Sequence, residues 1–112
     1  MNIEEFRSYC LSLKGTSEDL PFDNKTLVFK VMGKMFALTN LETFESINLK
    51  CDPEHAIELR EQYEAVTPGY HMSKKHWNTV ILDYSIDDDL IYEWIKDSYN
   101  LVVAKLTKKQ KE

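Results

Sequence analysis

The stretch Pro68–Asn78 concentrates side chains that can do chemistry. It contains two of the three histidines of the chain, together with two lysines, a tyrosine and a tryptophan. No acidic residue occurs from Ala65 to Leu82, although the whole chain carries a net charge of −5. Lysine and histidine attract anions, and aromatic rings offer flat faces on which a nucleobase stacks. The pattern indicates a surface that contacts anions or nucleic acid. The alternative is an irregular loop whose aromatic residues cap the core.

Three further lysines lie on or beside predicted strands. If Lys30 and Lys50 project from the same face of a sheet, they extend the loop into a basic patch; otherwise they are ordinary solvated side chains. Backbone N–H groups near Gly69, with Ser73, are further donors for a phosphate. The candidate residues for binding nucleic acid or another anion are Lys30, Lys34, Lys50, Tyr70, His71, Lys74, Lys75, His76, Trp77 and Asn78.

Metal binding and catalysis receive little support. A zinc site needs four converging ligands, and the grouping of Cys51, His55 and His71 has no typical ligand spacing. Cys51 alternates with apolar residues, and Cys10 lies on an apolar helix stripe, so both read as core residues rather than nucleophiles. No P-loop, GxGxxG or GxSxG motif is present. We therefore expect no catalytic residues, no metal site and no cofactor.

Apolar spacing and capping residues predict the elements that position these side chains. Apolar residues three or four positions apart predict helices, and alternation predicts strands. Asn2, Asp52 and the run 87–89 are expected helix caps. The expected helices cover 3–14, about 53–64 and a segment after 87–89, and the expected strands cover 26–32, 35–39, 44–51 and 77–83.

Three segments are less regular in pattern. Thr16–Asn24 is expected to be an extended connector, with Leu20 and Phe22 folded over the core. Ala65–His76 is expected to be irregular because Pro68 and Gly69 form a turn pair. Asn100 either interrupts the last helix or lies within a continuous one.

The resulting order is α-β-β-β-α-β-α. Strands in a run with helices before and after predict an α+β fold, in which an antiparallel sheet has its helices packed on one face. Leu27, Phe29 and Val31 share the expected buried face of the first strand. Trp94 belongs to the dense apolar stripe of the last helix.

Composition sets the class of protein. The chain has 112 residues, of which 43% are hydrophobic, so a single globular domain over 1–112 with a lysine-rich tail at 107–112 is expected. No apolar run approaches the roughly 20 residues that cross a bilayer. The N-terminus carries Glu4 and Glu5 and lacks a secretion signal, and two cysteines fit a reduced pair. We expect a monomeric cytoplasmic protein without a membrane partner.

Several motifs resemble the MmcQ/YjbR-like family of small bacterial proteins. They are Leu20-Pro21-Phe22, the run Phe29–Ala37, the run Asn48–Pro53 and the run Pro68–Asn78, followed by a terminal helix with Ile91, Trp94, Ile95, Ser98 and Tyr99. The similarity spans the chain from the first predicted helix to about Leu106.

The resemblance implies a CyaY-like α+β fold, whose helix–sheet arrangement has been likened to a double-wing nucleic-acid-binding motif. It therefore implies DNA or another polyanion as the partner, contacted by the candidate residues above. The CyaY-like label also suggests iron binding through surface carboxylates, but Glu4 and Glu5 are too few to support it. The sequence pI of about 5.2 favours a local contact, because general DNA-binding domains are strongly basic. A domain that binds a protein or a small phosphorylated ligand is the alternative.

Overall fold

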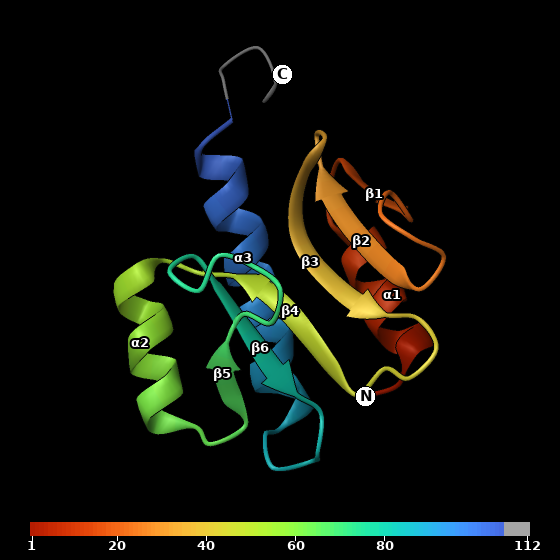
Figure 1. Cartoon of the computed structure of the whole chain (residues 1–112). Coiled ribbons are helices and arrows are strands. Elements are labelled where there is room, and N and C mark those ends of the chain that lie inside the picture. Colours follow the sequence, from red (N-terminus) through yellow and green to blue (C-terminus); the bar gives the residue numbers. More distant parts are fainter. Residues whose placement is uncertain (107–112) are drawn as a thin grey trace.

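The computed structural model describes residues 1–106, which form three helices and six strands (Figure 1). The predicted lysine-rich tail at 107–112 lies outside the described residues. The elements are α1 (Ile3–Ser12), β1 (Thr16–Asp19), β2 (Thr26–Val31), β3 (Lys34–Asn40), β4 (Ser46–Lys50), α2 (Pro53–Gln62), β5 (Val66–Pro68), β6 (Trp77–Ile81) and α3 (Asp88–Ala104).

All six strands belong to one antiparallel sheet with the order β1-β2-β3-β4-β6-β5. Phe6 of α1, Leu59 of α2 and Trp94 of α3 belong to the same buried cluster as Phe29 and Ile47 of the sheet. The helices therefore cover one face, and the predicted α+β fold is confirmed. We call the opposite face of the sheet the open face. Within residues 1–106, no helix has both the length and the apolarity needed to span a membrane.

Two strands, β1 and β5, were not predicted from the sequence. β1 was expected to be part of a connector over Thr16–Asn24 because Pro21 cannot donate to a ladder, but Pro21 follows the strand, and an edge strand with solvent on its outer side needs few apolar residues. β5 has only three residues and ends at Pro68, a residue tolerated at a sheet edge. The expected order is therefore corrected to α-β-β-β-β-α-β-β-α. Leu20 and Phe22 are exposed rather than folded over the core, since the chain leaves β1 at the sheet edge.

The N-termini of α1 and α2 carry residues that are preferred at helix starts. Asn2 and Glu5 form a reciprocal capping box, with Asn2 Oδ1 accepting from the Glu5 N–H at 2.8 Å. At α2, Pro53 occupies the first turn, where its missing N–H costs nothing. Asp52 stands at the N-cap position as predicted but makes no side-chain capping bond.

α3 is continuous through Asn100, and its C-terminal half lies in a fork of the sheet. The ladder between β3 and β4 ends at the pair Ala37–Leu49, and beyond this pair the strands diverge on either side of α3 (Figure 1). We call this divergence the fork. The buried Ser98 hydroxyl donates to the Phe36 carbonyl at 2.6 Å and accepts from the Lys50 N–H at 3.0 Å. A helix side chain thus replaces the missing strand-to-strand hydrogen bond.

Candidate nucleic-acid interface

The loop from Gly69 to His76 crosses from β5 to β6 and is anchored from two sides. The Gly69 N–H donates to the Trp77 carbonyl at 2.9 Å, and a Cβ at position 69 would lie 2.7 Å from the Trp77 Cβ, so only glycine fits. From α2, Arg60 donates to the Lys74 carbonyl and, at 2.7 Å, to Asn78 Oδ1. The loop is therefore held in place by the sheet and by α2.

Trp77 and Asn78 are buried residues that support the fold. Trp77 is buried on the open face in a small cluster with Val28 and Leu38, which Met72 of the loop helps to cover. Asn78 is buried on the helix side, where its Nδ2 donates to the Ala56 carbonyl at 3.2 Å. Their side chains are thus already committed to packing and to hydrogen bonds within the domain.

Tyr70 presents its ring to solvent while its backbone is fixed. The Tyr70 N–H donates to Thr79 Oγ1 at 2.9 Å, and its carbonyl accepts from Asn48 Nδ2 at 3.3 Å. Its side chain is 68% exposed. The His71 ring lies 4.0 Å from the Tyr70 ring, centroid to centroid, and His71 has a φ of 58°. A non-glycine residue in this left-handed region is a strained conformation of the kind that clusters at functional sites.

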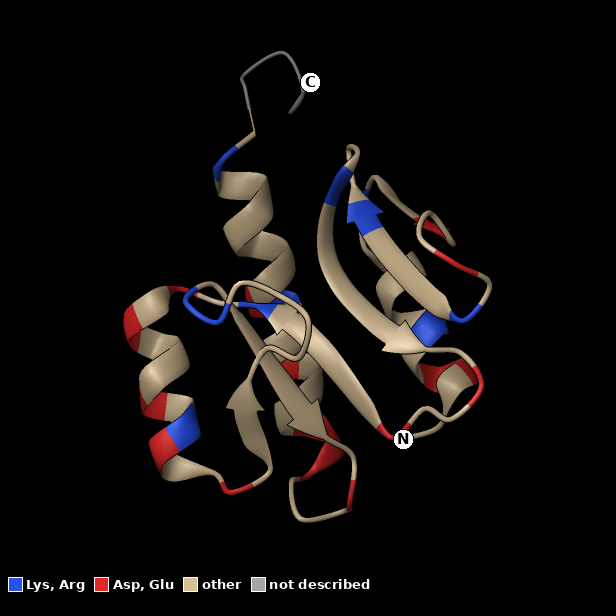
Figure 2. Cartoon of the chain, viewed as in Figure 1, with Lys and Arg blue, Asp and Glu red and all other residues tan. Residues whose placement is uncertain are grey.

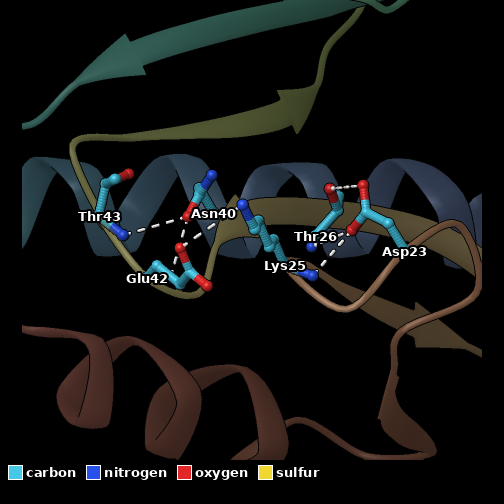
Figure 3. Close-up of polar contacts among 6 residues, drawn as sticks. All are labelled: Asp23, Lys25, Thr26, Asn40, Glu42 and Thr43. Carbon is cyan, nitrogen blue, oxygen red and sulfur yellow. Dashed lines mark hydrogen bonds and ion pairs between the residues drawn. The ribbon is translucent and has the colours of Figure 1, made fainter.

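A groove of about 480 Å³ crosses the open face between this loop and the turn before β2. Phe22, 65% exposed, lines one wall, and Tyr70 and His71 line the other. One end is built by two turns shown in Figure 3. There Asp23 Oδ1 accepts from the N–H groups of residues 25 and 26, and Asn40 Oδ1 accepts from those of residues 42 and 43. The lining residues are Phe22, Asp23, Thr26, Leu38, Thr39, Asn40, Ser46, Asn48, Tyr70, His71 and Met72.

Three lysines from different elements gather at the fork. Lys50 ends β4, Lys34 begins β3, and Lys105 follows α3. Burial lowers the pKa of the Lys50 ammonium, and the positive charges of Lys105 and Lys34 lower it further. Among the described residues, none of the three has a carboxylate within 4.0 Å. We call Lys34, Lys50 and Lys105 the fork lysines.

The remaining candidate residues differ in their bonding partners and in their exposure to solvent. Lys30 lies on the open face but forms an ion pair with Asp19 at 3.5 Å. Lys74 Nζ donates to the Gly69 carbonyl at 3.2 Å, while Lys75 is exposed and His76 is half-buried. The His76 carbonyl accepts from the Cys51 N–H, so this end of the loop adjoins the end of β4 and Lys50. The structure therefore places the end of the loop beside Lys50, the one predicted strand lysine that adjoins it.

Cys51 and His55 line a largely apolar cavity of about 100 Å³ between α2, α3 and the sheet. His71 lines the groove on the open face, so the grouping of Cys51, His55 and His71 does not converge. Within residues 1–106, no three His, Cys, Asp or Glu side chains gather in a way that would hold a metal ion. Cys10 is fully buried in the core, as predicted.

Cys51 is expected to be an unreactive thiol. Burial, with a smaller contribution from the carboxylates of Asp52 and Asp97, raises its pKa to about 11. At pH 8 its thiolate fraction is about 10⁻³, so alkylation by iodoacetamide is expected to run roughly a hundredfold slower than at an ordinary cysteine. Peptide mapping after timed alkylation from pH 7 to pH 10 measures this rate separately from that of Cys10. The Asp97→Asn variant should react faster, and a rate that levels off near pH 8.5 would contradict the prediction.

Sequence reasoning missed three residues of the site. Arg60, to which the sequence assigns no role, anchors the loop from α2. Phe22 was expected to fold over the core, and Asn48 was assigned no role, but both line the groove. For Phe22, the one signal in the sequence was an aromatic residue beside Pro21 in a polar, acidic stretch, which is typical of an exposed loop. For Arg60 and Asn48 no signal was present in the sequence, because their hydrogen-bond partners are distant along the chain.

Comparison with known proteins agrees with this architecture. The family model described as YjbR matches residues 11–101. The uncharacterized protein YbdF of Escherichia coli O157:H7 is 41% identical over 93 residues, covering 82% of this chain and 76% of YbdF. The uncharacterized protein YjbR of Escherichia coli K12 is 34% identical, covering 100% of this chain and 96% of YjbR.

A solved structure extends the agreement to three dimensions. The crystal structure of a Deinococcus radiodurans protein with domain DUF419 superimposes with a TM-score of 0.91 and 40% sequence identity, covering 97% of this chain and 84% of that one. The family match spans all six strands, α2 and most of α3, but only the last two residues of α1, so it includes the groove and the strands of the fork. The resemblance found in the sequence is confirmed, and the chain belongs to the YjbR family.

Proposed function

We propose that this protein binds nucleic acid on the open face of its sheet and at the adjoining fork, with the fork lysines contacting phosphates. The observation that carries the proposal is the convergence of Lys34, Lys50 and Lys105 from three elements with no carboxylate within 4.0 Å in the described part of the chain. Like charges held together raise the free energy of the unliganded protein, and a bound phosphate relieves that repulsion.

The distribution of charge supports binding in spite of the net charge of −5. Figure 2 shows blue segments around the open end of the fork, whereas red segments predominate on α2, on α1 and around the start of α3. Local fields depend on where charges lie, so an acidic protein can still attract a polyanion at one end. The exposed Lys75 and the half-buried His76 add to the basic side of this surface.

A small phosphorylated ligand is the second candidate. The groove volume of about 480 Å³ falls within the roughly 300–1,000 Å³ typical of small-molecule sites. Such a ligand would contact the same lysines with a single phosphate, so its affinity would depend weakly on salt. A nucleic acid neutralises several positive charges at once and responds steeply to salt.

The test is the salt dependence of binding to fluorescein-labelled single-stranded DNA and duplex DNA of mixed sequence. Removing Lys34 and Lys50 as Lys34→Gln with Lys50→Gln is expected to weaken binding and to reduce the slope of log K against log salt by about 0.7 per lysine on single strands. Fluorescence anisotropy across 20–200 mM salt measures the slope.

A matched pair of single variants controls for charge alone. Lys50→Gln and Lys96→Gln each remove one positive charge, one at the fork and one on the exposed side of α3. Only Lys50→Gln should change the slope. Equal effects of the two substitutions, or no binding of either DNA by the parent protein at 20 mM salt, would refute the proposed function.

A further inference from the structure

We propose that the groove between Phe22 and Tyr70 receives one unpaired base of a nucleic-acid strand whose phosphates lie at the fork lysines. This inference rests on the proposed function and specifies its substrate class as single-stranded nucleic acid. Four features of the open face support it: the aromatic walls, the charge at each end, the polar floor and the spacing along β4.

The walls are suited to a flat ring. Phe22 and Tyr70 come from loops 48 residues apart in the chain, yet both line the same groove and each exposes about two-thirds of its side chain. Exposed aromatic side chains are the residues on which unpaired bases stack, with little dependence on sequence. The Tyr70 backbone is fixed by Thr79 and Asn48, and the His71 ring packs beside the Tyr70 ring, so this wall is preorganised.

The two ends of the open face carry opposite charge. Hydrogen bonds from the N–H groups of Lys25 and Thr26 lower the pKa of the Asp23 carboxyl, which is therefore ionised at neutral pH. This anion at one end of the groove repels phosphate and accepts hydrogen bonds from the amino or imino groups of a base. Lys50 lies on this face toward its other end, beside the other fork lysines, and phosphate is favoured there.

The groove floor offers hydrogen bonds to a neutral ring. Ser46 contributes a hydroxyl, and Asn40 at one end contributes an amide, to a lining that also contains the apolar Leu38 and Met72. A mixture of apolar surface and a few polar groups is typical of sites that fix the orientation of a heterocycle. A phosphate alone would not use the apolar part.

The spacing along β4 sets the distance between the groove and Lys50 at the fork. Asn48 lines the groove, and Lys50 lies two residues farther along the same face of the same strand, about 7 Å away. This separation matches the distance between a base and the phosphate of its own or the next nucleotide. A base in duplex DNA is paired and stacked between its neighbours, so only an unpaired or extruded base enters the groove.

The test compares a 12-nucleotide single strand of mixed sequence with an abasic strand of the same length. The two carry the same phosphates and differ in their bases. Tyr70→Ala and Phe22→Ala are each expected to weaken binding of the normal strand by about fivefold or more and to leave binding of the abasic strand unchanged. Tyr84→Ala is the matched control, because Tyr84 is 90% exposed and lies outside the groove.

The outcomes separate this inference from the proposed function. If the parent binds neither strand at 20 mM salt, the proposed function fails and the inference fails with it. If the parent binds both strands equally and neither groove variant differs from Tyr84→Ala, the function stands and the base pocket is overturned. Adenosine and guanosine monophosphates bound as tightly as the normal strand, and lost in Tyr70→Ala, would also overturn it, because the occupant would be a free nucleotide.

Discussion

Replacing Trp94 with alanine is expected to lower the free energy of unfolding by about 3–5 kcal/mol. Trp94 is buried in the main core from its position on α3, and its ring meets the Tyr63 ring edge-on with centroids 5.1 Å apart. Trp94 also lines the existing cavity of about 100 Å³. Truncation would therefore enlarge this existing cavity rather than open a new one. The cavity lies between α2, α3 and the sheet, and their backbones limit how far it can collapse. Urea denaturation followed by circular dichroism measures the change.

A matched control distinguishes loss of packing from loss of an apolar side chain as such. Ile57→Ala removes apolar atoms from α2 at an exposed position and is expected to change stability by less than about 1 kcal/mol. A cost below about 1.5 kcal/mol for Trp94→Ala, or one equal to that of Ile57→Ala, would show that Trp94 does not organise this core.

Ser98→Ala is expected to cost about 2–4 kcal/mol, more than any ordinary serine on a helix. Its hydroxyl satisfies two main-chain groups at once, the Phe36 carbonyl and the Lys50 N–H. Alanine leaves the Phe36 carbonyl and the Lys50 N–H without this partner, in a region where Ser98 is only 1% exposed. Each buried polar group that loses its partner costs about 1–3 kcal/mol of stability. Equilibrium urea unfolding at pH 7 measures this cost directly.

Ser8→Ala provides the comparison, since Ser8 lies on an exposed position of α1. Alanine at this position is expected to be neutral or slightly stabilising because of its helix propensity. If Ser98→Ala is equally neutral, the hydroxyl bridge does not hold the fork and the strands must be joined by packing alone.

The fold was predictable where side-chain patterning carries the information. Alternation identified β2 and β4, and the capping residues located the starts of α1 and α2. β1 and β5 were missed because both are edge strands whose pairing is supplied by neighbours distant in sequence. The β-bulge at Phe36 places that residue and Ala37 together in the core, a shift that strict alternation does not reveal.

The candidate site was predictable in location but not in the role of each residue. The basic and aromatic composition of the loop indicated a surface near β6, and Tyr70 and His71 do line a groove there. Trp77 and Asn78 were indistinguishable in sequence from ligand-binding residues, yet both are buried. Their burial is decided by Gly69 and Arg60, whose contacts with them depend on tertiary structure.

The hydroxyl bridge in the fork also gives this protein an internal reporter. The N–H of Lys50 is bonded to a side chain of α3 rather than to a neighbouring strand. Its amide proton therefore exchanges with solvent when the last helix leaves the sheet, even while the rest of the ladder stays paired. A single amide resonance, followed in deuterated water, thus measures the opening equilibrium of the C-terminal helix at the same residue whose ammonium lies among the fork lysines.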